Sequence, residues 1–258
     1  MKQLILSLLA LGFVCGTTLP LSAEEKKDKA PAAEAAKEKA PEPKKETIKR
    51  NGLTLNVTVE AADFPPEVTK KMADTFFVVY PKLMAKFNPK ASKTVNFYIR
   101  EKTDVRGRMV PAYAHFHNQS IYFNANWMKT RKGNDIDVVT HELTHVIQSY
   151  PYKNGVERPG WITEGLADYA RFRFGVDNKG SGWAVPEYNE KQKYTDAYRV
   201  TGRFFAWLEE NTKPDILTKL DNAMRKGEYT DEFWKQQTGK TIDELWANYG
   251  KNPKLKKQ

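Results

Sequence analysis

The sequence predicts an α+β fold in which a small mixed sheet occupies the first half of one domain and helices occupy the second half. Between residues 48 and 125 the apolar residues recur mainly with the period of two that is typical of strands. From about residue 136 onward they recur at helical spacing, in segments separated by Gly and Pro. Strands followed by helices, without a regular alternation of the two, are typical of α+β proteins.

The first half is expected to contain one helix among its strands. The expected strands lie at 48–60, at 95–99, and on either side of a turn at Asn118-Gln119 within 111–125. Pro65-Pro66 begins a helix that runs to about residue 87. Because proline lacks the N–H that a helix interior needs, Pro81 predicts a kink or a break in this helix.

The second half is expected to contain six helices. They span about 136–150, 161–174, 195–210, 214–226, 230–237 and 241–249. Asn134 or Asp135 is expected to cap the first of them, and Pro151 ends it. Gly175 ends the second.

The first 23 residues have the pattern of a signal peptide. Lys2 precedes an apolar run that extends to Val14, and Ala23 is a small residue of the kind at which cleavage occurs. We therefore expect a secreted or periplasmic protein whose mature chain has no transmembrane segment. The single cysteine, Cys15, would be removed with the signal peptide, so that no thiolate remains for a disulfide or a metal site.

Composition divides the remainder of the chain. Residues 24–47 consist mainly of Glu, Lys, Ala and Pro and predict a disordered spacer, residues 48–253 form the domain, and residues 254–258 form a basic tail. The chain carries 42 Lys and Arg against 32 Asp and Glu, a net charge of +10. Such a charge favours weak attraction to anionic cell-surface polymers. No nucleic-acid motif is present, so specific nucleic-acid binding is not expected, and we expect a monomer.

Two of the four histidines, His141 and His145, lie four residues apart in the first helix of the second half. Residues four apart share one face of a helix, so both imidazoles can point at the same place. Glu142 follows His141, close enough to reach a water on a metal there without being a ligand itself. This His-Glu-x-x-His pattern is typical of catalytic Zn²⁺, which takes neutral imidazoles and keeps one coordination position open.

A catalytic zinc needs a third protein ligand, and the next helix offers two acids, Glu164 and Asp168, that share a face. We assign Glu164 to the metal and Asp168 to a hydrogen bond behind one of the histidines, and the reverse assignment stays open. Their neighbours are largely apolar, and buried carboxylates need a partner. Gly165 leaves room beside the ligand for the two helices to approach closely.

The expected reaction is hydrolysis of a peptide bond in a protein or peptide substrate. Zinc lowers the pKa of a bound water and polarises a carbonyl oxygen. Glu142 would take the proton of the attacking water and pass it to the leaving amine. A further donor should stabilise the oxyanion, for which Tyr198 is preferred over Tyr194.

His115 and His117 form a rival metal site, because residues two apart on a strand share a face. No acid or cysteine lies close by in the sequence to complete a ligand set, which favours two hydrogen-bonded histidines beside a turn. The neighbouring strand, Ser120 to Asn124, could instead be an edge strand that pairs with an extended peptide substrate.

With these residues in view, the chain resembles the plant and bacterial basic secretory proteins, which are grouped with the gluzincin-like zinc peptidases. The resemblance extends over about residues 48–249 and rests on four ordered segments, His141 to Gln148, Glu164 to Arg171, Tyr198 to Phe204 and Gly239 to Trp246. It implies a zincin-like metallopeptidase domain, a secreted zinc-dependent protein with endopeptidase activity, and Glu164 as the third ligand. The Lys, Ala and Pro-rich spacer departs from the family's core pattern.

Two other functions are compatible with the same residues. The chain could be a binding protein of the cell envelope that keeps the scaffold and the zinc, or a basic protein that recognises acidic polymers through a structural zinc. A binding protein has no need for Glu142. A structural zinc is bound by four protein ligands, whereas the sequence offers three.

Overall fold

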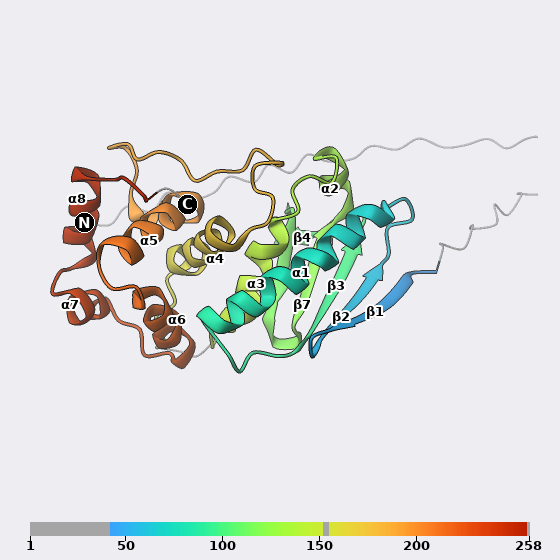
Figure 1. Ribbon diagram of the computed structural model, residues 1–258, viewed down its shortest axis with the longest axis horizontal. Helices are drawn as coiled ribbons and strands as arrows, with labels where there is room; N and C mark the ends of the chain where they lie inside the picture. The colour runs from blue at the N-terminus through green and yellow to red at the C-terminus, as the bar shows by residue number, and fades with distance from the viewer. Residues whose placement is uncertain (1–41, 152–154, 257–258) are drawn as a thin grey trace, which may run out of the picture. The chain divides into compact units, whose positions relative to one another are not determined.

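A computed structural model describes residues 42–151 and 155–256 of the 258-residue chain. The expected signal peptide, with Cys15, and the expected spacer as far as residue 41 lie outside the described residues. Within them, strands precede a largely helical half (Figure 1). The predicted α+β class is therefore confirmed.

The main sheet has five strands in the order β1-β2-β3-β7-β6. They are β1 (Lys44–Arg50), β2 (Leu53–Val59), β3 (Thr94–Arg100), β6 (Ala112–His115) and β7 (Ser120–Asn124). The three inner strands run parallel, and β1 and β6 pair antiparallel at the two edges. Two short strands, β4 (Asp104–Val105) and β5 (Arg108–Met109), form a separate hairpin.

Eight α-helices accompany the sheet in the described part of the chain. They are α1 (Pro66–Lys86), α2 (Ala125–Thr130), α3 (Val138–Gln148), α4 (Gly160–Phe174), α5 (Tyr198–Asn211), α6 (Ile216–Lys226), α7 (Glu232–Thr238) and α8 (Ile242–Lys251). In Figure 1, α1 crosses the face of the sheet and α4 to α8 gather beyond its end. Helix α3 contacts α1, α4, β6 and β7, so it joins the sheet to the helical half.

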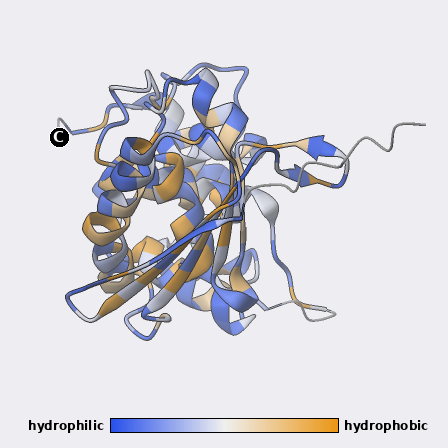
Figure 2. Ribbon diagram, turned by 90° about the vertical axis from the view of Figure 1, so that its right-hand side faces the viewer, coloured by the Kyte–Doolittle hydropathy of each residue, from blue (hydrophilic) through white to orange (hydrophobic). Residues whose placement is uncertain are grey.

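The core follows from the alternation of apolar residues along the strands and their helical spacing in α1. Leu55 of β2 and Phe97 of β3 project from the face of the sheet that α1 covers. There Phe97 packs against Phe76 of α1, and these three side chains and Tyr80 of α1 are buried. Figure 2 shows hydrophobic residues on the strands and on the helices packed against them. Each such side chain contributes roughly 1.5–3 kcal/mol when it is fully buried.

The first strand differs from the prediction. The sequence predicted a single strand over 48–60, with the spacer ending at residue 47, and this boundary is wrong because residues 44–47 belong to β1. β1 and β2 form a hairpin whose turn, Asn51-Gly52, has φ values of 50° and 75°. Positive φ at both positions is the geometry of a type I′ turn, which Asn-Gly favours. Nearly all of β1 is exposed, so it lacks the apolar alternation that reveals a strand.

Pro81 does not break α1, which continues to Lys86. The missing N–H leaves the Phe77 carbonyl without its usual donor, but packing outweighs this loss because Tyr80 and Leu83, on either side of the proline, are fully buried. Helix α2 and the β4–β5 hairpin were not predicted.

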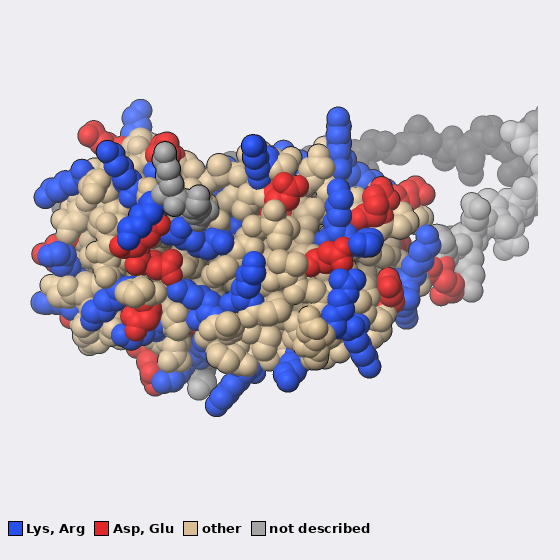
Figure 3. All heavy atoms as spheres, viewed as in Figure 1, with Lys and Arg blue, Asp and Glu red and all other residues tan. Residues whose placement is uncertain are grey.

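Among the described residues, no helix combines the length and the apolarity that crossing a bilayer requires. Lys and Arg side chains are spread over the face seen in Figure 3, with acidic groups among them. The positive charge is therefore not gathered into one patch on this face.

Candidate metal centre

Helices α3 and α4 run antiparallel and are joined at both ends by buried polar side chains. At the start of α3, the carboxylate of Asp137 accepts hydrogen bonds from the backbone N–H groups of Val176 (2.7 Å) and Asp177 (2.5 Å), just beyond the end of α4. At the end of α3, the Gln148 amide donates to the Thr163 carbonyl at 2.9 Å, near the start of α4. These contacts fix the register of the two helices.

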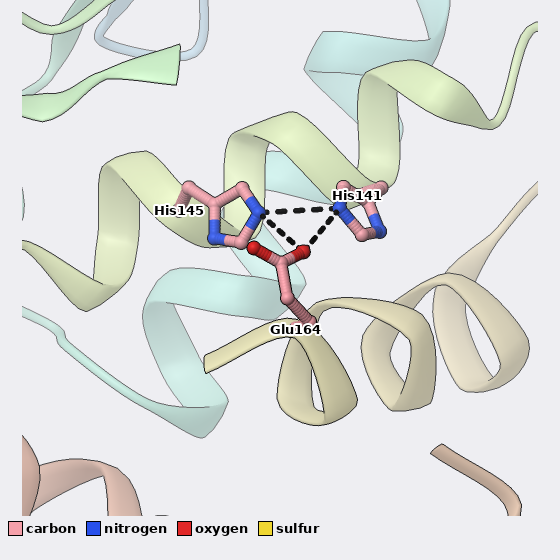
Figure 4. Close-up of side chains that lie close together, drawn as sticks. All are labelled: His141, His145 and Glu164. Carbon is pink, nitrogen blue, oxygen red and sulfur yellow. Dashed lines mark hydrogen bonds and ion pairs between the residues drawn. The ribbon is translucent and has the colours of Figure 1, made fainter. Parts of the chain in front are cut away.

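That register brings His141, His145 and Glu164 together (Figure 4). The two Nε2 atoms of His141 and His145 lie 3.1 Å apart. Glu164 Oε2 lies 3.3 Å from the first and 3.4 Å from the second. Among the described residues this is the cluster of His, Cys, Asp and Glu that could hold a metal ion.

The dimensions of this triangle fit a small tetrahedral cation. Ligand atoms held about 2.0–2.1 Å from a tetrahedral Zn²⁺ are roughly 3.3–3.4 Å from one another. The separations of 3.1, 3.3 and 3.4 Å in the structure are close to this value. The donor set is also one that zinc accepts, because it consists of two imidazoles and one carboxylate.

The opposite nitrogen of each imidazole is already hydrogen-bonded. Nδ1 of His141 lies 2.7 Å from Asp168 Oδ1, and Nδ1 of His145 lies 2.7 Å from Gln148 Oε1. Both acceptors favour the tautomer with hydrogen on Nδ1, which leaves the two Nε2 lone pairs facing each other and the Glu164 carboxylate. Three electron-rich atoms that converge in this way favour a cation between them. The residues therefore fit a metal ion.

The carboxylates around the histidines control their ionisation. Burial alone would lower the pKa of His141, but Asp168, Glu164 and Glu142 together raise it well above its usual value. Burial likewise opposes the charged form of His145, whose pKa is raised mainly by Glu164. The pKa of Glu164 is lowered by the two histidines in spite of its burial. The site as a whole is therefore built to hold positive charge.

Glu142 does not join the ligand cluster. Its side chain is buried, and its Oε2 atom has no hydrogen-bond partner among the described residues. Burial raises the pKa of Glu142, an effect that the neighbouring His141 and His145 oppose. A buried carboxylate oxygen without a partner is costly, which indicates that this atom faces a ligand or a water in the working protein.

Tyr198 lines the same cavity as the histidines, and its ring lies parallel to that of His141 with the centroids 6.2 Å apart. Tyr198 is 54% exposed, and its partial desolvation in the cleft, together with the nearby carboxylates of Glu164, Asp168 and Glu142, raises its pKa. Its backbone φ is 46°, and the preceding Ala197 has φ 62° and ψ −170°. Both values are unfavourable for residues with a side chain, and such strain is concentrated at functional sites.

Tyr194 lies elsewhere. Its hydroxyl is 2.9 Å from an Asp243 carboxylate oxygen, and its ring packs against Trp161 and Trp246. Tyr194 belongs to the short 3₁₀ turn Tyr194–Asp196, and α5 begins only at Tyr198. Of the two tyrosines, therefore, Tyr198 is the one that faces the histidines.

The cavity in front of the triangle is a cleft of about 830 Å³. One wall consists of α3 and α4, and the other includes β6 and the segment before it, with Val110, Pro111 and Tyr113. The β4–β5 hairpin contributes Val105 to the lining. A cleft of this size can hold several residues of an extended peptide.

The strand along the cleft is β6 and not the one that the sequence indicated. Ser120 to Asn124 form β7, which pairs with β3 on one side and β6 on the other, so its backbone groups are already used. The sequence could not show this, because strand order depends on the long connection between β3 and β7. The edge of the sheet beside α3 is β6.

His115 and His117 do not lie on the same strand. His115 ends β6, and His117 lies in the 3₁₀ turn Phe116–Asn118 that follows. Their ring centroids are 6.0 Å apart, and His115 Nδ1 is 3.1 Å from Asn118 Oδ1. No acid joins them in a ligand cluster within the described part of the chain.

Gly165 lets α4 approach a neighbouring helix closely. The expected neighbour was α3, but the helix that packs against Gly165 is α5. A Cβ atom at Gly165 would lie 2.3 Å from Thr201 Cγ2, and one at Gly202 would lie 2.9 Å from the backbone nitrogen of Tyr169. These two glycines let α4 and α5 pack closely. They thereby place Tyr198, at the start of α5, beside the candidate ligands on α3 and α4.

A mixed sheet with an edge strand along the cleft, followed by two antiparallel helices that carry a His-Glu-x-x-His motif and a third acid, defines a zincin-like metallopeptidase fold. The chain belongs to the family described as "Peptidase of plants and bacteria", which it matches over residues 66–249. The resemblance found in the sequence motifs is thus confirmed.

Comparison with solved structures finds matches at low identity. Aminopeptidase A from Legionella pneumophila, in complex with aspartic acid, has a TM-score of 0.53 and 15% identity, over 80% of this chain and 27% of that one. An M1 zinc metallopeptidase from Deinococcus radiodurans has a TM-score of 0.48 and 12% identity, over 84% of this chain and 53% of that one. This chain therefore spans only part of these proteins. No curated protein matches it.

Proposed function

We propose that the chain is a secreted zinc-dependent peptidase in which His141, His145 and Glu164 hold Zn²⁺. The observation that carries the proposal is the triangle of Nε2, Nε2 and Oε2 atoms, with sides of 3.1 to 3.4 Å, at the bottom of a cleft. The family match supports peptide hydrolysis. The pattern of the first 23 residues supports export from the cytoplasm.

Zinc held by these residues would supply a Lewis acid and lower the pKa of a bound water to roughly 7. Glu142 is the residue that moves protons. Its Oε2 atom, buried and without a partner among the described residues, takes a proton from the attacking water. The protonated Glu142 then donates to the nitrogen of the leaving amine.

Tyr198 stabilises the negative charge that develops on the carbonyl oxygen of the substrate. Its hydroxyl is a hydrogen-bond donor, and its ring lines the cleft parallel to that of His141. The strained backbone at Ala197 and Tyr198 sets the direction in which the side chain enters the cleft. Donors placed in advance stabilise an oxyanion without a reorganisation cost during the reaction.

The substrate lies along β6 as an added strand. One edge of β6 pairs with β7, which leaves the other edge, toward the cleft, to hydrogen-bond with an extended peptide. Within the described lining, the carboxylates are those of the metal centre, Glu142, Glu164 and Asp168. None remains to bind the free α-amine that an aminopeptidase recognises, which favours an endopeptidase.

The test is hydrolysis of an unfolded protein by the purified, zinc-loaded chain and by a Glu142→Gln variant. The variant keeps the shape of the side chain but cannot accept the proton. We expect it to retain its zinc and to lose at least about 10²-fold in turnover. Undiminished turnover would remove Glu142 from the mechanism. Zinc binding without any turnover by the unaltered protein would favour a binding protein of the cell envelope.

A further inference from the structure

The charged residues that line the cleft fall into two groups of opposite sign. The acids and histidines all belong to the metal centre. Outside it, the charged residues in the lining are three arginines, Arg158, Arg171 and Arg199. Beyond the metal centre, the described lining of the cleft therefore contains arginines and no acidic residue.

Arg171 is not available to a ligand. Its guanidinium pairs with Asp135, hydrogen-bonds to Asn178 at 3.0 Å and stacks on Trp183 at 4.5 Å. The side chain is buried, so its charge is already neutralised inside the protein. Arg158 is half-buried and also takes part in interactions of its own.

Arg199 differs from both. It is exposed, and none of the ion pairs in the described part of the chain involves it. Its single hydrogen bond there runs from Nη1 to the carbonyl oxygen of Ala184, at 3.5 Å. This long contact leaves most of the five donors of the guanidinium unused.

Arg199 lines the same cleft as the candidate metal ligands. It follows Tyr198, whose ring is parallel to that of the ligand His141, and both residues line the cleft. A planar guanidinium matches a carboxylate in a bidentate arrangement, which gives direction as well as charge.

We propose that Arg199 binds a carboxylate of the peptide substrate, so that the enzyme prefers peptides with an acidic group close to the bond that is cleaved. The carboxylate can be the side chain of Asp or Glu or the free C-terminus of a short peptide, since both present the same two oxygen atoms. This inference rests on the proposed peptidase function and adds the class of substrate. It also gives the +10 charge of the chain a role, because acidic substrates are attracted to it.

The test uses one short synthetic peptide of fixed sequence in four forms. Its central residue is Glu or Gln, and its C-terminus is a free acid or an amide. Binding of each form to zinc-loaded Glu142→Gln protein is measured by fluorescence anisotropy, and kcat/KM is measured with the unaltered protein. The same measurements are made with Arg199→Gln, with Arg199→Lys and with Arg131→Gln, an exposed arginine outside the cleft lining.

We expect the acidic form to bind about three- to tenfold more tightly than its neutral counterpart, the range for a charged hydrogen bond at a partly solvated site. The ratio should fall to near one in Arg199→Gln, recover in part in Arg199→Lys and stay unchanged in Arg131→Gln. Preference for Glu over Gln identifies a side-chain carboxylate, and preference for acid over amide identifies the C-terminus.

The outcomes separate this inference from the proposed function. If all four peptides are hydrolysed with equal kcat/KM, the carboxylate site is disproved and the peptidase stands. If none is hydrolysed but the acidic forms bind more tightly through Arg199, the carboxylate site stands and the peptidase fails. A preference that survives in Arg199→Gln also overturns the inference.

Discussion

At the scale of single residues, the two ligand histidines are oriented by groups of different charge. His141 donates to the carboxylate of Asp168, whereas His145 donates to the neutral amide oxygen of Gln148, each at 2.7 Å. Gln148 is the site residue that sequence reasoning did not assign a role. Its signal was its place three residues after His145, because residues three apart share a helix face.

Gln148 does more than hold one imidazole, because its amide nitrogen also donates to the Thr163 carbonyl next to the ligand Glu164. We therefore expect Gln148→Ala to lower the affinity for zinc by about 10-fold or more, the usual effect of removing a group behind a ligand. A competition titration with a chromogenic chelator measures this.

Gln148→Glu is the matched variant, because it keeps the acceptor for His145 and loses the donor to Thr163. An intermediate affinity is expected for it. Equal affinity of the Ala variant and the unaltered protein would mean that the ring of His145 is oriented by packing alone.

At the scale of elements, the site depends on the register of α3 and α4. Sequence spacing alone was sufficient to place His141 with His145 on one face and Glu164 with Asp168 on another, because a regular helix has a fixed period. It could not supply the buried contacts that join the two helices. Asp137 illustrates this, since its partners Val176 and Asp177 offer backbone groups that carry no sequence signature.

Asp137→Ala tests the hydrogen bonds that join the start of α3 to the end of α4. The Asp137 side chain is fully buried, and besides the two backbone groups it accepts a hydrogen bond from the Thr140 hydroxyl at 3.0 Å. Removing it leaves buried donors unpaired, so we expect a loss of about 2–4 kcal/mol in the free energy of unfolding. Urea unfolding followed by circular dichroism measures this loss.

Asp137→Asn keeps one acceptor oxygen and should lose less stability than the Ala variant. If the free energy of unfolding of the Ala variant fell by less than about 0.5 kcal/mol, the value usual for surface positions, these hydrogen bonds would not hold the two helices together.

The helices were more predictable than the strands, and the reason is physical. Each of the helices α3 to α8 buries apolar side chains that recur at helical spacing, and this spacing can be recognised in the sequence. The exposed strand β1 has no such pattern, and its best signal was the Asn51-Gly52 turn. The order of β6 and β7 depends on pairing between distant segments, which no local pattern encodes.

At the scale of the whole molecule, the sheet and the helical half meet at α3, and the candidate metal centre lies at that junction. The sheet contributes β6 as a wall of the cleft, α3 and α4 contribute the candidate ligands, and α5 contributes Tyr198 and Arg199. The cleft is therefore assembled from elements that are distant in sequence. The His-Glu-x-x-His motif is local, so the two histidines could be identified from the sequence. The walls of the cleft come from distant segments and could be identified only from the structure.

The most direct test of the account is X-ray absorption at the zinc edge, made on the purified protein after its zinc content has been measured. The account predicts one zinc per chain, with two imidazole nitrogens and oxygen donors at about 2.0–2.1 Å and no sulfur. A protein that binds no stoichiometric zinc, or a zinc with four imidazoles that recruits His115 and His117, would contradict it.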